Sequence, residues 1–112
     1  MRTTLMLSGA VLLLQSTLPF SLACVRVWND VCFNYAANDD VFWANDCDFT
    51  GPDLASVRGS ADRCGSACQT TRGCERWSWN DYQGGTCYLK GAGAWGLETA
   101  RGINCGFRNR DK

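Results

Sequence analysis

The chain has 112 residues, which is enough for one domain at most. Its eleven basic and eleven acidic residues balance and are scattered along the sequence, whereas a nucleic-acid-binding protein would show a basic face. The sequence contains no histidine, which excludes zinc sites with histidine ligands as well as Ser-His-Asp and Cys-His catalysis. Composition and charge therefore argue against a nucleic-acid partner and against histidine-dependent chemistry.

The N-terminus has the layout of a secretory signal peptide. Arg2 supplies a short positive region, and Leu5–Leu14 is an apolar run that is too short to span a bilayer. Ser21–Ala23 then places small residues before a cut at Cys24. No later stretch is apolar for long enough to cross a membrane. We therefore expect residues 1–23 to be removed and the mature chain to be secreted into the extracellular space.

Two pairs of acidic residues come next, and they are Asp39 with Asp40 and Asp46 with Asp48. Paired carboxylates serve glycosidases, and the second pair also matches the first half of an EF-hand loop. However, position 12 of such a loop would be Val57, where calcium requires a bidentate glutamate. A chain of this size also seldom forms the deep cleft that catalysis needs. We interpret these residues as solvated turns and predict no metal site, no cofactor and no enzymatic activity.

A helix is predicted over Ser60–Thr71. Ser60 suits the N-cap position, and Gly73 suits the C′ position just after the helix. Cys64 and Cys68 are four residues apart and therefore lie on the same face of this helix.

A β-hairpin is predicted directly after the helix. Cys74–Trp79 alternates as a strand does, Asn80–Gly85 has the composition of a turn, and Cys87–Lys90 reads as the returning strand. Both helix cysteines therefore face a hairpin that carries one cysteine on each strand.

Trp95 stands out because it lies in a glycine-rich segment, Lys90–Gly96. A large aromatic side chain at a mobile surface position suits stacking on a sugar ring or a protein hot spot. The alternative is that Trp95 folds back over the hairpin and covers the core. Trp43, in contrast, is predicted to be a half-buried strand residue.

All eight cysteines lie in the expected mature chain, at positions 24, 32, 47, 64, 68, 74, 87 and 105. The absence of a C-x-x-C pair removes both the zinc-ribbon spacing and the thioredoxin-type redox motif. An even number of cysteines in a small secreted chain predicts four disulfides, each worth about 2–4 kcal/mol of stability. Spacing alone does not choose among the possible pairings.

At this point the sequence resembles the PAN/Apple superfamily. The motifs that carry the resemblance are Cys64-x-x-x-Cys68, Cys74-Glu75-Arg76-Trp77-Ser78-Trp79 and Cys87-Tyr88-Leu89-Lys90. They correspond to the family's helix motif, its C-x-x-[aromatic]-x-[aromatic] strand and its C-x-L-K strand. Upstream, Cys47–Leu54 resembles the opening strand and its G-x-D-L turn, and downstream Ile103–Cys105 fits the closing strand.

The resemblance implies an α+β fold, a small disulfide-rich antiparallel sheet crossed by one helix with Trp77 and Trp79 in the core. It implies the nested pairs Cys47–Cys105, Cys64–Cys87 and Cys68–Cys74, and it leaves Cys24 and Cys32, outside the usual module, for each other. We accordingly divide the chain into a signal peptide (1–23), an N-terminal extension with its own disulfide (24–46), a PAN/Apple-like domain (47–107) and a C-terminal tail (108–112).

The resemblance also implies reversible adhesion, because PAN/Apple modules bind proteins or carbohydrates and have no catalytic residues of their own. Our first hypothesis is a secreted carbohydrate-binding module for a glycan or polysaccharide. Its candidate ligand-binding residues are Trp95, Tyr88 and Trp43 for stacking and Arg76, Lys90 and Asp81 for hydrogen bonds. The alternative is a protein–protein interaction module, protease-binding or effector-like, with the charged rim Arg72, Arg76 and Lys90. A third reading is a stable scaffold with a non-adhesive role.

Overall fold

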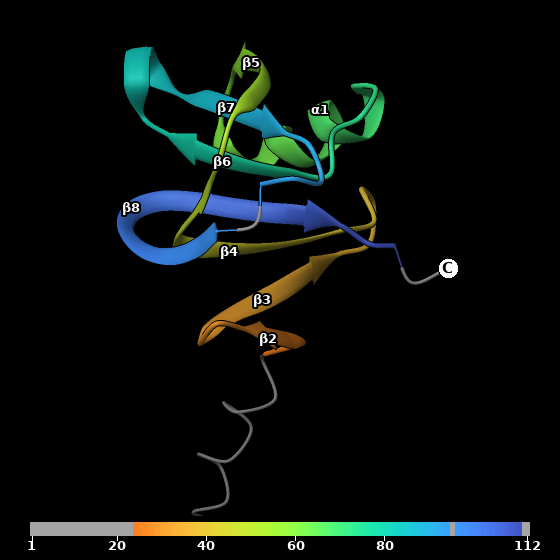
Figure 1. The fold of residues 1–112 in the computed structure, drawn as a ribbon, viewed down its shortest axis with the longest axis vertical. Helices are drawn as coiled ribbons and strands as arrows, with labels where there is room; N and C mark the ends of the chain where they lie inside the picture. Colours follow the sequence, from red (N-terminus) through yellow and green to blue (C-terminus); the bar gives the residue numbers. More distant parts are fainter. Residues whose placement is uncertain (1–23, 95, 111–112) are drawn as a thin grey trace, which may run out of the picture.

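The fold is an antiparallel sheet with one short α-helix (Figure 1). The computed structural model describes residues 24–94 and 96–110, so the predicted signal peptide, Trp95 and the last two residues of the predicted tail lie outside the described residues. The strands are β2 (Arg26–Trp28), β3 (Val31–Ala36), β4 (Val41–Thr50), β5 (Asp53–Arg58), β6 (Arg76–Asn80), β7 (Thr86–Lys90) and β8 (Gly96–Arg108). In the described part of the chain, the order across the sheet is β2-β3-β4-β8-β6-β7-β5. The predicted α+β class is confirmed.

The α-helix is shorter than the predicted range, Ser60–Thr71. A 3₁₀ turn, η3 (Ala61–Arg63), precedes α1 (Cys64–Thr70), and a second one, η4 (Tyr82–Gly84), connects β6 to β7. Ser60 does not cap the helix, because its hydroxyl donates to the carboxylate of Asp62 instead. The first turn therefore tightens into a 3₁₀ geometry, and α1 begins only at the first helix cysteine.

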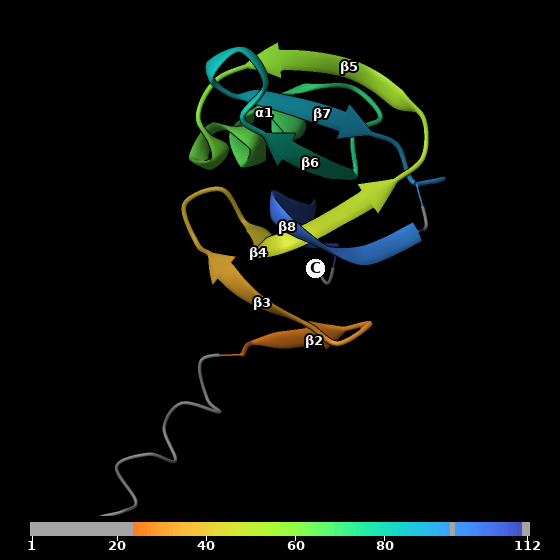
Figure 2. The same cartoon turned by 90° about the vertical axis from the view of Figure 1, so that its left-hand side faces the viewer.

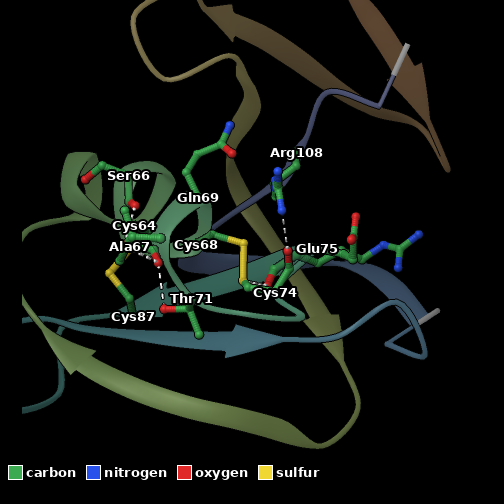
Figure 3. Close-up of a disulfide and its surroundings, with 12 residues drawn as sticks. Cys64, Ser66, Ala67, Cys68, Gln69, Thr71, Cys74, Glu75, Cys87 and Arg108 are labelled. Carbon is green, nitrogen blue, oxygen red and sulfur yellow. Dashed lines mark hydrogen bonds between the residues drawn. A yellow bond between two sulfur atoms is a disulfide. The ribbon is translucent and has the colours of Figure 1, made fainter. Parts of the chain in front are cut away.

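Four disulfides connect the helix, the hairpin and the long strands. The bonds are Cys24–Cys32, Cys47–Cys105, Cys64–Cys87 and Cys68–Cys74. The last three are the nested pairs that the resemblance implies, and the first joins the two cysteines that lie outside the usual module. Figure 3 shows the two bonds that hold α1, one to β7 and one to the segment before β6. α1 packs against β6, β7 and β8, so it covers only one part of one face of the sheet.

Two apolar clusters lie on opposite faces of the sheet, because successive strand residues point to opposite sides. The first, on the helix face, comprises Val41, Cys64, Cys68, Cys74, Trp77, Cys87 and Leu89. The second, on what we call the aromatic face, comprises Val31, Phe33, Phe42, Ala44, Cys47, Phe49, Leu97, Cys105 and Phe107. Trp79 is only half-buried beside the first cluster, and its indole N–H donates to the Gly59 carbonyl at 2.8 Å.

The segment 24–46 continues the sheet and covers part of the aromatic face. β3 pairs with β4, and β2 and β3 lie at the end of the sheet opposite β5 (Figures 1 and 2). The Trp28 ring lies 5.3 Å from that of Phe49 and 5.5 Å from that of Phe107. In the β2–β3 turn, the Asn29 side-chain amide donates to the Leu97 carbonyl at 3.2 Å. The N-terminal hairpin is therefore packed onto the predicted PAN/Apple-like region.

The prediction of turn residues holds for one acidic pair and is wrong for the other, because Asp46 and Asp48 lie within β4. Asp39 and Asp40 belong to the β3–β4 turn. Asp46 lies at a register shift between β4 and β8, where its carboxylate accepts the Gly102 N–H at 2.9 Å. Among residues 24–94 and 96–110, the helices are too short to cross a bilayer.

Candidate binding sites

A hollow of about 340 Å³ opens beside the helix, between β4, the β3–β4 turn and the η3–α1 segment. We call it the helix-side hollow. Two rings and four polar side chains border it, and these are Trp43, Trp77, Asn38, Asp39, Asp62 and Asn104. Its volume lies within the range of about 300–1,000 Å³ that is typical of small-molecule sites.

The floor of the helix-side hollow depends on one glycine. Trp77, Gly106 and Trp43 are aligned across β6, β8 and β4, so they share the helix face. A Cβ atom at Gly106 would lie 2.1 Å from the Trp77 ring and 2.6 Å from the Phe42 carbonyl oxygen, so the ring occupies the space of the missing side chain. Trp77 is 3 % exposed, whereas Trp43 is 38 % exposed and presents its ring to solvent.

The rim of the helix-side hollow is held by α1. The side-chain amide of Gln69 donates to the Asp39 carbonyl at 2.6 Å and to the Asp40 carbonyl at 3.4 Å, which fixes the β3–β4 turn against the helix. Gly65 permits this close approach, because a Cβ there would lie 3.2 Å from the Asp39 carboxylate. The polar rim is therefore positioned by hydrogen bonds and is not a free loop.

The Asp40 side chain stabilises the same turn from the other side. Its carboxylate accepts the Tyr35 hydroxyl at 2.7 Å and the Asn109 side-chain amide at 3.0 Å. The hydrogen bond to Asp40 raises the pKa of the Tyr35 phenol above its ordinary value, with smaller contributions from desolvation and from the negative charge of Asp40. Asp40 is thus engaged within the fold, and Asp39 is the acidic residue of this turn that borders the hollow.

The chemistry of the helix-side hollow combines an apolar ring with amide and carboxylate groups. Among the described residues, no lysine or arginine borders it. Amide and carboxylate side chains together donate to and accept from hydroxyl groups, and an indole face suits an apolar C–H surface. The arrangement therefore fits an uncharged, hydroxyl-rich ligand.

Two of the predicted ligand-binding residues, Tyr88 and Lys90, border a different hollow of about 210 Å³. Lys90 is 6 % exposed, and its ammonium group donates to the Gly51 carbonyl at 3.0 Å and to the Asp53 carboxylate at 2.6 Å. These contacts join the β4–β5 turn to β7, so the Lys90 charge is engaged within the protein. Tyr88 is partly exposed beside it.

The other predicted residues lie apart from one another. Arg76 borders a hollow of about 310 Å³ on the aromatic face, together with three further arginines, and we call this the arginine hollow. Asp81 is an exposed turn residue that borders none of these hollows, and Trp95 lies outside the described residues. The structure therefore brings Tyr88 and Lys90 together, and it places Trp43 and Arg76 in two separate hollows. It also separates the predicted rim, because Arg72 borders neither the hollow of Arg76 nor that of Lys90.

Sequence reasoning missed the polar partners of Trp43. Asn38 and Asp62 lie in two separate turn segments, and Asn104 follows a bulge in β8. Asn38 and Asp62 belong to no motif, and Asn104 belongs only to the segment that resembles the family's closing strand. The pairing of β4 with β8 and the docking of α1 bring the three residues together. The sequence held one indication of the position of Asn104. Its neighbour Cys105 bonds to Cys47, and this bond places Asn104 next to β4.

The fold is that of a small, disulfide-rich module with shallow hollows on both faces of its sheet. Residues 47–90 match the family model of the PAN domain, which supports the PAN/Apple-like domain that the resemblance predicted. No curated protein matches the sequence. PAN domains are generally non-catalytic modules that bind proteins or carbohydrates. The four disulfides and the PAN domain fit an extracellular module.

Proposed function

We propose that this protein is a secreted, non-catalytic carbohydrate-binding module whose binding site is the helix-side hollow. The observation that carries the proposal is the exposed ring of Trp43. It lies in a hollow that amides and carboxylates border, with no cation among the residues that the structure describes. A sugar ring offers an apolar C–H face for stacking and hydroxyl groups for the rim.

The rigidity of the hollow supports the proposal. Trp77 fills the space above Gly106, and Gln69 holds the β3–β4 turn, so neither the floor nor the rim has to be ordered when a ligand arrives. A preorganised site loses little conformational entropy on binding, which favours affinity. The signal peptide predicted at residues 1–23 and the disulfides support secretion, which would bring the module to extracellular polysaccharides.

The test is retention of the oxidised protein on insoluble cellulose and chitin, together with a glycan array. We expect Trp43→Ala to lower affinity by about tenfold, because a lost stacking contact of this kind is worth on the order of 1 kcal/mol or more. Tyr82→Ala is the matched control, because Tyr82 is 58 % exposed and borders none of the hollows described above. Trp95→Ala, run in parallel, tests the other tryptophan that the sequence predicted as a ligand.

Two outcomes would contradict the proposal. If wild-type protein is retained on no glycan, the account fails and a protein partner becomes the leading explanation. If Trp43→Ala and Tyr82→Ala bind as wild type does while Trp95→Ala does not, carbohydrate binding stands but its site is not the helix-side hollow.

A further inference from the structure

β5 is an open edge of the sheet, because among the described strands it pairs with β7 alone. Figure 2 shows it at the end of the sheet opposite β2. All six of its residues are exposed, and these include the apolar side chains of Leu54 and Val57. An exposed edge of this kind is a ready template for pairing with another strand.

The hydrogen bonds to β7 show which backbone groups of β5 point outward. The Gly59 N–H donates to the Gly85 carbonyl at 3.0 Å, in the same register as the β5–β7 ladder that precedes it. Hydrogen bonding alternates between successive residue pairs of an antiparallel ladder. The backbone groups of Val57 therefore point toward β7, and those of Ser56 and Arg58 point away from it. A second strand can bond to these two residues without displacing β7.

The charges of β5 lie at its two ends, with Asp53 first and Arg58 last. A register shift between Asp53 and Ala55 accommodates one extra residue in β5. Because of this shift, Asp53, Ser56 and Arg58 lie opposite alternate residues of β7 and share one face of the sheet. Ser56 is thus midway between an anion and a cation.

Two copies of β5 are complementary when they run antiparallel with Ser56 opposite its own copy. Directly opposite residues of an antiparallel pair have the same hydrogen-bonding pattern, so a strand can pair with itself about a residue whose groups point outward. This register places Arg58 opposite the second copy's Asp53, and it does so at both ends of the pair. On the other face of the sheet, Val57 lies opposite the second copy's Ala55.

Both charged groups can make this contact without losing one inside the protein. Among residues 24–94 and 96–110, Arg58 has no ion-pair partner. Asp53 accepts the Lys90 ammonium through Oδ1, but its side chain stays partly exposed and a carboxylate has two oxygens that accept. The formal net charge of the chain is zero, so overall repulsion does not oppose the association of two copies.

We propose that two copies of this protein associate through β5 and form one continuous antiparallel sheet. The occupant of the edge is a second copy because β5 complements itself both in hydrogen bonding and in charge. β2, the strand at the other end of the sheet, has three residues and offers a shorter ladder.

This dimer has a consequence for binding. The two-fold axis between antiparallel strands is perpendicular to the sheet, so the helix faces of both copies lie on the same side. The dimer therefore presents two helix-side hollows to one polymeric ligand, which raises avidity. This consequence rests on the function proposed above, whereas the pairing of β5 does not.

The test is the mass of the oxidised protein without ligand, measured by sedimentation equilibrium from micromolar to near-millimolar concentrations. We expect a reversible equilibrium between monomer and dimer. Ser56→Pro removes an outward-pointing N–H and keeps the bonds to β7, because proline is tolerated where the N–H of an edge strand faces solvent. We expect this variant to be monomeric, and near-ultraviolet circular dichroism checks that it is folded.

Two charge reversals make the test specific. Arg58→Glu places a like charge opposite the second copy's Asp53, and Arg101→Glu makes the same change at an exposed residue of β8. We expect the first to raise the dissociation constant of the dimer by about tenfold or more, because two repelling pairs replace two attractive ones. The second should change it by about twofold or less, because exposed charges act weakly at a distance.

A protein that stays monomeric at every concentration would overturn the proposal and leave β5 as an edge for an extended peptide of another protein. A dimer that persists in folded Ser56→Pro, or that Arg58→Glu and Arg101→Glu weaken equally, would also overturn it, because that dimer would use another surface. No glycan is present in these measurements, so none of the outcomes depends on carbohydrate binding.

Discussion

The helix-side hollow and the arginine hollow are built from neighbouring residues of the same strands. Trp77, Gly106 and Trp43 form one row across β6, β8 and β4, and Arg76, Phe107 and Phe42 form the adjacent row. A step of one residue along each strand moves from one face of the sheet to the other. Within the described ranges, the first row ends in a hollow that carboxylates and no cation border, and the second row borders the arginine hollow.

A net charge of zero conceals two surfaces of different character. Asp39 and Asp62 come from turn segments beside α1, whereas Arg26 and Arg76 come from strands and border the arginine hollow. We therefore expect the two hollows to respond to different substitutions.

We expect the largest effect from Cys64→Ala, which should unfold the domain and disrupt both hollows. Cys64→Ala breaks the bond between α1 and β7, and the loss of such a disulfide from a small domain costs about 2–5 kcal/mol. We expect the near-ultraviolet signal to be lost and proteolysis to be rapid. A Cys64→Ala protein with a native signal and full protease resistance would show that the account overestimates this bond.

The next largest effect is expected from opening a disulfide on one face of the sheet while the other face stays intact. Cys24→Ser/Cys32→Ser opens the β2–β3 hairpin, which positions Arg26 and Trp28, and we expect a cost of about 2–3 kcal/mol. Retention on neutral glycans should persist, because this hairpin lies on the aromatic face. Cys68→Ser/Cys74→Ser is the matched control, because it opens a loop of similar length on the helix face and should lower that retention. Equal retention of the two variants would contradict a binding site on the helix face.

One added methyl group at Gly106 should displace the Trp77 ring that forms the floor of the helix-side hollow. Gly106→Ala places a Cβ against the Trp77 ring, and overpacking of this kind costs about 1–3 kcal/mol. We expect thermal unfolding at lower temperature and weaker retention on neutral glycans. Gly93→Ala is the control, because nothing lies within 4 Å of a Cβ at that position. Equal stability of the two variants would disprove the role assigned to Gly106.

The smallest effect is the pH dependence of stability at the β3–β4 turn, which contains Asp39 and Asp40. The hydrogen bond to Asp40 favours the neutral phenol of Tyr35 and raises its pKa in the folded protein. Its contribution to stability is therefore fully present below the ordinary tyrosine pKa and is lost as pH rises through the raised value. Alkaline absorbance titration should show a late-titrating phenol that is missing in Tyr35→Phe. A Tyr35 that titrates at or below its ordinary pKa would contradict this contact.

The helix, the hairpin and the PAN motifs could be predicted because their signals are local in the sequence. The helix start could not, because the Ser60 hydroxyl pairs with Asp62 instead of a backbone N–H. The engagement of Lys90 was also hidden, since its partners Gly51 and Asp53 come from a distant turn. The hollows themselves depend on strand register, and a bulge such as that at Asp46 has no clear sequence signal.

The most direct measurement compares wild-type protein with Trp43→Ala and Tyr82→Ala on a neutral glycan that wild-type protein binds. We predict that Trp43→Ala loses about tenfold in affinity and that Tyr82→Ala binds as wild type does. Equal affinities of the two folded variants would contradict a binding site in the helix-side hollow.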